Sequence, residues 1–204
     1  QKINMIKFIS IPVILFSLFA LPSCKAQDNS FLGNKDVVKV EKSIQPFKSL
    51  IVTTGGNVHL YPSSTTTLQL KGEKRCVEKI AVAVSSKTLS ISSKDNHLDK
   101  CHVEIHIGTP NFDEIQLSGG GKLKIKDGFA PIEVLKCSVK DGGNLEMAST
   151  PIDSLFAIVY GGGKITTQVA TLLDGTVKGG GTIFYTGNPK IKSDISNGGV
   201  IKRR

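Results

Sequence analysis

The amino-acid sequence predicts an all-β fold: a single-domain parallel β-helix or β-solenoid with an irregular N-terminal half. Three observations predict it. Glycine clusters recur along the second half of the 204-residue chain, apolar and polar residues alternate between the clusters, and the composition suits short strands joined by tight turns. With 21 glycines, no tryptophan and 6% aromatic residues, this composition is untypical of a helical bundle.

The glycine clusters have a regular spacing. They are Gly119–Gly121, Gly142–Gly143, Gly161–Gly163, Gly179–Gly181 and Gly198–Gly199. Between successive reference glycines, one in each cluster, the intervals are 22, 20, 18 and 18 residues. A repeat of this length is the signature of a solenoid. Glycine recurs because a sharp corner between two strands needs a positive φ or a close backbone approach.

Three columns of similar side chains precede the last four clusters. They are Leu135, Leu155, Leu173 and Ile191; Cys137, Ala157, Gly175 and Ser193; and Val139, Val159, Val177 and Ile195. The columns are two residues apart, which predicts a strand with one face turned inward. Their large–small–large order suits a narrow interior that larger residues would overpack. Pro131 and Pro151 fall at matching offsets and predict a second corner.

The upstream half is a less regular version of the same pattern. Short alternating segments begin with Leu50 and Val52 before Gly55–Gly56 and continue through Val103, Ile105 and Ile107. They predict further strands, and we expect no helix after the N-terminal segment. Because a solenoid needs covered ends, these strands are expected to cap one of them, while Lys202–Arg204 solvates the other.

The first residues resemble an export signal. Lys2 and Lys7 precede an apolar run at Phe8–Leu21 that is shorter than the about 20 residues of a membrane span. Two cleavage sites fit: before Cys24, which would become a lipid-modified first residue, or after Ala26. The predicted organisation is therefore a lipoprotein-type signal at 1–23, extending to 26 in the second case, a polar tether at 24–36 and the solenoid at 37–204. The expected location is the outer membrane, periplasm or cell surface.

Three cysteines lie beyond the predicted signal and tether. Cys76 and Cys101 flank a predicted strand pair and can form a disulfide in an oxidising compartment, the alternative being two unpaired thiols. Cys137 belongs to the column of small residues and is expected to be buried and reduced.

Charge and polar clusters exclude several kinds of site. The formal net charge is +9, but only three arginines occur and no aromatic residues accompany them, so nucleic acid is not an expected partner. His102, Glu104 and His106 alternate along a predicted strand, where neighbouring side chains lie too far apart to share one metal ion. His59 and His97 have no evident partner. Neither a metal nor another cofactor is predicted.

Longer segments resemble a known family. They are Phe47–Val58, which begins FKSLIVTTGG, then Thr88–Ile91, Val103–Ile105, and Asn111–Gly121, which reads NFDEIQLSGGG. These segments are similar to the putative auto-transporter adhesin, head GIN domain family, a domain of unknown function common in Bacteroidetes envelopes. The resemblance covers roughly residues 37–201. It implies a β-helix-like fold on exported, often lipid-anchored proteins, and it implies no catalytic residues.

The predicted function is an exported binding or adhesion module without catalysis, whose partner is a glycan or an envelope protein. The candidate binding face carries Lys122, Lys124, Lys126, Thr166, Gln168 and Tyr185. One alternative is a carbohydrate-active enzyme, but the carboxylates do not share a column, and Asp127 and Asp141 lie in Lys-Asp-Gly turns where aspartate commonly caps the backbone. The other alternative is a structural envelope protein.

Overall fold

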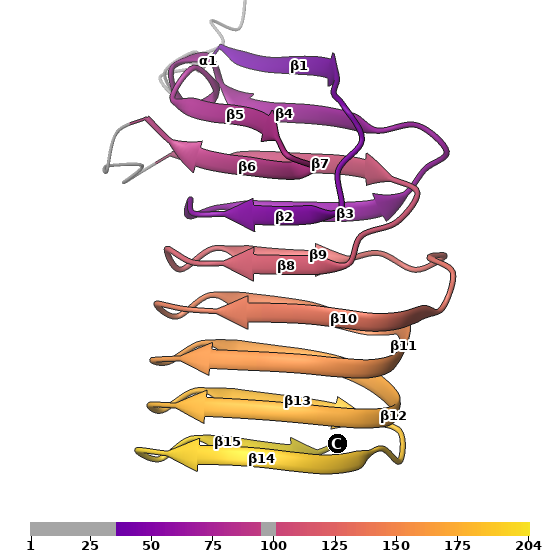
Figure 1. Cartoon of the computed structure of the whole chain (residues 1–204). Helices are drawn as coiled ribbons and strands as arrows, with labels where there is room; N and C mark the ends of the chain where they lie inside the picture. Colours follow the sequence, from indigo (N-terminus) through magenta and orange to yellow (C-terminus); the bar gives the residue numbers. More distant parts are fainter. Residues whose placement is uncertain (1–35, 95–100) are drawn as a thin grey trace, which may run out of the picture. The chain divides into compact units, whose positions relative to one another are not determined.

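The computed structural model describes residues 36–94 and 101–204, which belong to a compact unit at Lys35–Arg204 (Figure 1). The predicted signal segment, Cys24 and His97 lie outside the described residues. The elements are β1 (Val37–Ser43), β2 (Ser49–Val52), β3 (Asn57–Pro62), β4 (Thr67–Glu73), α1 (Lys74–Val77), β5 (Ile80–Ser85), β6 (Thr88–Ser93), β7 (Val103–Thr109), β8 (Glu114–Leu117), β9 (Lys122–Ile125), β10 (Ile132–Val139), β11 (Asn144–Tyr160), β12 (Lys164–Lys178), β13 (Thr182–Thr186), β14 (Lys190–Ser196) and β15 (Val200–Arg203).

The strands form two facing stacks, and successive coils contribute a strand to each. The stack that we call the β9 sheet runs β1-β4-β7-β3-β9, then the first parts of β11 and β12, then β13 and β15. The β10 sheet runs β5-β6-β2-β8-β10, then the second parts of β11 and β12, then β14. All described pairings are parallel except β1–β4, β4–β7 and β5–β6. The predicted parallel β-solenoid is confirmed.

The three predicted columns form one inner side of the β10 sheet. Leu135, Leu155 and Leu173 are in register and fully buried, and so are Val139, Val159 and Val177. The small column leaves room for side chains that cross from the other sheet: a Cβ on Gly175 would lie 2.7 Å from Cδ1 of Ile201. The strand face predicted from the period of two is therefore the buried face.

Both predicted corners are present. At the glycine corner Gly179 has a φ of +111°, and a Cβ there would lie 3.0 Å from the backbone of Gly161 in the preceding coil. A residue with a side chain would therefore have a strained backbone here and would also clash with the preceding coil. The second corner falls inside β11, where the register shifts between Met147 and Pro151 as the strand passes from one sheet to the other.

The upstream coils do not stack in chain order. The coil of β2 and β3 lies between the coil of β6 and β7 on one side and the coil of β8 and β9 on the other. The chain therefore adds a coil on one side and then crosses back to build the regular part on the other (Figure 1). β1 and β5 are the outermost strands of the two sheets at this end, as expected for strands that cap it.

The prediction that no helix follows the signal is wrong in one place. The four residues of α1 form a single helical turn between β4 and β5, with Cys76 and Val77 buried. A disulfide joins Cys76 to Cys101, with 5.5 Å between their Cα atoms, and so ties this turn to the start of β7. Cys137 is a free, buried thiol, and burial raises its pKa to about 12.

Candidate functional site

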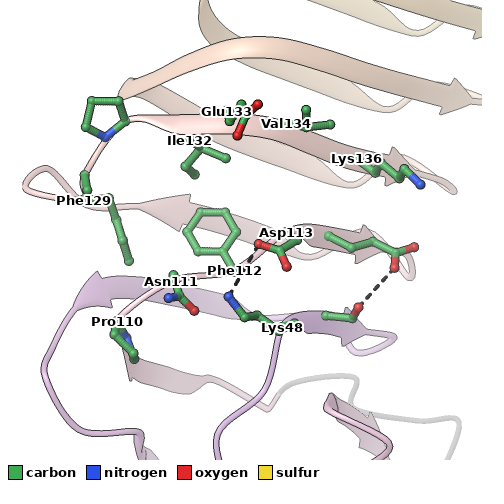
Figure 2. A pocket seen from close by; sticks show the side chains of 14 residues that line it. Lys48, Pro110, Asn111, Phe112, Asp113, Phe129, Ile132, Glu133, Val134 and Lys136 are labelled. Carbon is green, nitrogen blue, oxygen red and sulfur yellow. Dashed lines mark hydrogen bonds and ion pairs between the residues drawn. The ribbon is translucent and has the colours of Figure 1, made fainter.

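A depression of about 630 Å³ opens on the outer side of the β10 sheet, where two loops border β2, β8 and β10 (Figure 2). One loop, residues 110–113, leads into β8, and the other, residues 126–131, joins β9 to β10. Both belong to the second corner of the solenoid, where glycine clusters are absent from the sequence and larger side chains fill the turn. The depression therefore arises where the repeat is least regular.

The inner wall of the depression is aromatic. The Phe112 and Phe129 rings meet edge to face with centroids 5.1 Å apart, and they are 1% and 7% exposed. Ile132 lies beside them (Figure 2). Edge-to-face packing is favoured by the ring quadrupoles, and each ring holds the other against the core. This wall is thus a rigid apolar surface at the base of an open site.

Backbone hydrogen bonds hold the first loop in place. The Lys48 carbonyl accepts hydrogen bonds from the amides of Asp113 (2.8 Å) and Glu114 (3.3 Å), and the Asp113 carbonyl accepts one from the Lys136 amide (3.0 Å). The Thr109 hydroxyl donates to the carbonyl of Asn111 at 3.0 Å. Because these hydrogen bonds continue the backbone ladder between coils, the sheet fixes the positions of the residues on the rim.

The rim of the depression carries charges of both signs. Lys48 Nζ lies 3.8 Å from a carboxylate oxygen of Asp113. Glu114 uses both of its oxygens, accepting from the Ser49 hydroxyl at 3.1 Å and from the Gln116 amide at 2.9 Å. Lys136 and Glu133 complete the rim (Figure 2). A ligand here would meet an apolar wall edged by hydrogen-bonding groups, the usual composition of a binding site for a small polar molecule.

A second depression of about 300 Å³ continues the first along the same sheet and shares Glu114 and Lys136 with it. Its other outward-facing lining residues are Ser138, Phe156, Ile158, Asp174 and Thr176. We call the two depressions together the groove. Successive rungs of its central row carry Glu114, Lys136, Phe156 and Asp174, which pair in register across β8, β10, β11 and β12. Rungs of a sheet are about 4.8 Å apart, so the groove offers alternating acidic, basic and aromatic contacts at a fixed spacing.

β11 is apolar on both of its faces within this region. Leu155, Ala157 and Val159 point inward, while Phe156, Ile158 and Tyr160 are 38–40% exposed on the outer side. Lys140 lies over the Tyr160 ring, 5.5 Å from its centroid. A contiguous row of exposed apolar side chains on a rigid sheet is a common mark of a binding surface.

The predicted binding face lies on the opposite sheet and is not one continuous surface. Lys122, Lys124 and Lys126 are exposed on or directly after β9. Thr166 and Gln168 are on β12, where Thr166 is 9% exposed and Gln168 is exposed. Tyr185 pairs with the buried Thr167 and packs against the core. It therefore belongs to an inward row and does not extend the face of the lysines.

One of these lysines is engaged by a neighbouring coil. Lys122 Nζ lies 3.0 Å from an oxygen of Glu146. Partial burial disfavours the ionised carboxyl of Glu146, but the Lys122 ammonium, with Lys124 and a hydrogen bond from Asn144, outweighs it and holds the pKa of Glu146 below its usual value. Lys122 is thus less available to a ligand than Lys124.

The histidines on this sheet have neighbours that the sequence did not reveal. His59 and His106 are in register on β3 and β7, and their rings stack with centroids 4.9 Å apart. Burial, and then the nearby charges of His106 and Lys126, lower the pKa of His59. Glu104 lies 3.7 Å from His106, while His102 precedes β7 and is exposed. Over residues 36–94 and 101–204, no three His, Cys, Asp or Glu side chains gather in a way that could hold a metal ion.

Sequence reasoning missed the residues of the groove. One signal was available: all six positions of the run Leu155–Tyr160 are apolar, although one face of that strand was expected to meet solvent. Phe112 and Phe129 gave no such signal, because their meeting depends on two loops from different coils.

Within the described part of the chain, no helix has the length and apolarity needed to cross a membrane.

Several solved structures of bacterial proteins are similar to this chain. A protein described as a putative adhesin from Bacteroides fragilis is 23% identical, with a TM-score of 0.57 over 83% of this chain and 98% of its own. A putative adhesin from Parabacteroides merdae is 13% identical, with a TM-score of 0.40 over 84% and 98%. A protein described as a putative lipid binding protein from Parabacteroides distasonis is 16% identical, with a TM-score of 0.48 over the same shares.

No curated protein matches the chain at a significant level. The family match covers residues 46–134 and 130–189, which span the upstream coils, the groove and most of the regular coils. The chain therefore belongs to the family described as putative auto-transporter adhesin, head GIN domain.

Proposed function

We propose that this protein is an exported, non-catalytic binding module of the cell envelope, and that its ligand is a glycan held in the groove. The observation that carries the proposal is the row of Glu114, Lys136, Phe156 and Asp174 on successive rungs beside an aromatic wall. A sugar ring is amphipathic, with apolar faces and hydroxyl edges, so it matches a surface that alternates rings with charged hydrogen-bonding groups.

The state of the carboxylates supports binding rather than catalysis. Glycoside cleavage needs two carboxyl groups that face each other across the scissile bond. In the groove both oxygens of Glu114 accept hydrogen bonds, and Asp113 pairs with Lys48. Asp127 accepts a hydrogen bond of 2.6 Å from Ser149, and Asp141 has a φ of +54° in its turn. These carboxylates thus have hydrogen-bond or ion-pair partners within the protein or lie in a turn, which supports a binding role for the groove.

The proposal predicts that groove substitutions abolish binding while the fold persists. Phe156→Ala and Lys136→Ala should each weaken binding to a glycan selected on an array by about tenfold or more, because a central aromatic or charged contact carries a large share of binding energy. Affinity for the selected glycan would be measured by titration calorimetry. Both side chains are exposed, so the melting temperature should hardly change.

Two further lysine variants make the comparison decisive. Lys42→Ala, on the outermost strand of the other sheet, is a matched control and should bind like the wild type. Lys124→Ala tests the face of lysines predicted from the sequence as a separate contact surface. Loss of binding in Lys124→Ala alone would show that the ligand binds the β9 sheet instead of the groove. If the glycan array gave no signal and the protein specifically retained an envelope protein, the ligand would be a protein rather than a glycan.

The proposal also includes a lipid anchor at Cys24. Two acyl chains on an N-terminal cysteine contribute about 0.8 kcal/mol for each buried methylene, which suffices for stable attachment to a membrane. Extraction of the wild type without detergent should therefore leave the protein in the membrane fraction, and Cys24→Ser should release it. Equal recovery of both in the soluble fraction would contradict the anchor and would favour cleavage after Ala26.

A further inference from the structure

The coil formed by β14 and β15 leaves one side of each sheet open. Among the described strands, β14 pairs only with β12 and β15 only with β13. Each therefore presents a row of backbone amides and carbonyls along its outer edge, and such a row is a template for pairing with another strand. The two edges lie side by side at one end of the solenoid (Figure 1).

Apolar residues that are buried in earlier coils are exposed at this end. Ile191 and Ile195 continue the columns of Leu173 and Val177, which are fully buried, yet they are 37% and 45% exposed. On β15, in the other sheet, Ile201 continues the column of the fully buried Ile183 but is only partly buried. Within the described residues, the last coil thus presents an apolar surface framed by two open strand edges.

The sequence of β14 is complementary to itself when two copies run antiparallel. With Ser193 facing Ser193 of the partner subunit, Lys192 faces Asp194 of the partner subunit and Ile191 faces Ile195 of the partner subunit. Lys190 then faces Ser196 of the partner subunit. Lys192 and Asp194 both lie on the outer side of the sheet, in register with Asp174 and Thr176. Opposite charges directly across a strand pair stabilise it, and like charges destabilise it.

A two-fold axis through Ser193 relates the two antiparallel copies of β14, and the same axis also suits β15. Ser193 is in register with Gly175, and a Cβ on Gly175 would lie 2.7 Å from Cδ1 of Ile201. Ser193 and Ile201 therefore face each other across the interior, at matching positions of the two opposed strands. An axis through Ser193 therefore also passes by Ile201. Ile201 then faces its own equivalent, and Lys202 faces Val200 of the partner subunit. Both edges can be paired by one rotation.

Basic residues are the main obstacle to such pairing. Lysines on edge strands commonly prevent edge-to-edge association, and this end carries Lys190, Lys192, Lys202, Arg203 and Arg204 against Asp194. In the proposed register, however, no basic residue of β14 or β15 stands opposite another basic residue. More distant like charges lie in solvent, where salt screens them beyond about 8 Å.

We propose that two copies of this chain associate end to end through β14 and β15, in a closed two-fold dimer. The interface consists of antiparallel edge pairing, burial of the exposed isoleucines and two equivalent Lys192–Asp194 ion pairs. The dimer closes because the strands at the other end of each solenoid, β1 and β5, are different ones, so a two-fold interface leaves no second copy of itself exposed. The groove stays open on both subunits.

Charge reversal tests the register directly. The exported protein carrying Cys24→Ser, which excludes the lipid, would be studied by light scattering and sedimentation at micromolar concentrations. Lys192→Asp and Asp194→Lys alone should each raise the dimer Kd by about tenfold or more, since each places like charges opposite one another twice. The double variant Lys192→Asp/Asp194→Lys should dimerise like its parent, and so should an equimolar mixture of the two single variants.

Each result supports the dimer or overturns it. Asp194 also lies 3.9 Å from Lys178 of its own chain, and this contact is lost in the double variant as well, so recovery of dimerisation in that variant isolates the intersubunit pair. A protein that stays monomeric over the whole range overturns the proposal. So do a dimer that is indifferent to the single substitutions, and a ladder of higher species, which would indicate head-to-tail growth.

Discussion

Gly187→Ala is expected to lower the stability of the protein strongly. Gly187 has a φ of +97°, and a Cβ at this position would overlap the carbonyl oxygen of Val169 in the preceding coil. Strained backbone and steric overlap each cost about 1–3 kcal/mol, so a loss of about 4 kcal/mol in the free energy of unfolding is expected. Urea denaturation followed by circular dichroism would measure it.

A glycine of the same repeat supplies the control for this result. Gly180 has open space around the site of its Cβ and does not require a positive φ. Gly180→Ala should therefore leave the denaturation midpoint within experimental error or raise it slightly, because alanine restricts the unfolded chain. If both variants lost the same stability, the effect could not come from the close approach of the coils at Gly187.

Phe112→Ala should cause the second large loss. The ring is 1% exposed and packs edge to face on Phe129, so its removal leaves a cavity beneath the groove. Truncation of a buried phenylalanine typically costs about 3–5 kcal/mol. We expect a lower midpoint in thermal unfolding and, at temperatures where the variant is still folded, weaker ligand binding because the Phe129 wall loses its support.

Phe156→Ala is the matched substitution for Phe112→Ala. It removes the same atoms from the outer side of the sheet, where the ring is 39% exposed, so its cost in stability should stay below about 1 kcal/mol. The two variants thus separate stability from binding: Phe112→Ala affects both, and Phe156→Ala affects binding alone. Equal destabilisation by the two would contradict burial as the cause of the large loss in Phe112→Ala.

The inward columns could be predicted because a solenoid repeats its local environment. Leu135, Leu155 and Leu173 occupy equivalent places in successive coils, so one physical requirement appears three times in the sequence. A glycine cluster recurs for the same reason. Tyr185 was assigned to the wrong face although the same repeat covers it. The 18-residue repeat already sets Tyr185 beside Thr167, in an inward row, so grouping it with Thr166 overlooked the alternation of the strand.

The groove could not be predicted in the same way. Phe112 and Phe129 lie in two different loops, and only the stacking of β8 beside β10 brings their rings together. The crossing of the upstream coils is equally invisible in the sequence, because an alternating strand carries no mark that selects its neighbour. The turn α1 was missed since four residues are too few to show a helical period.

The amino-acid sequence was enough to predict the solenoid, its buried face and its corners, because each is a local requirement that the chain repeats. The order of the upstream coils, the aromatic wall of the groove and the open edges of β14 and β15 became visible only in the folded domain. These features depend on which segments become neighbours, and that is decided by the packing of the whole domain rather than by any stretch of its sequence.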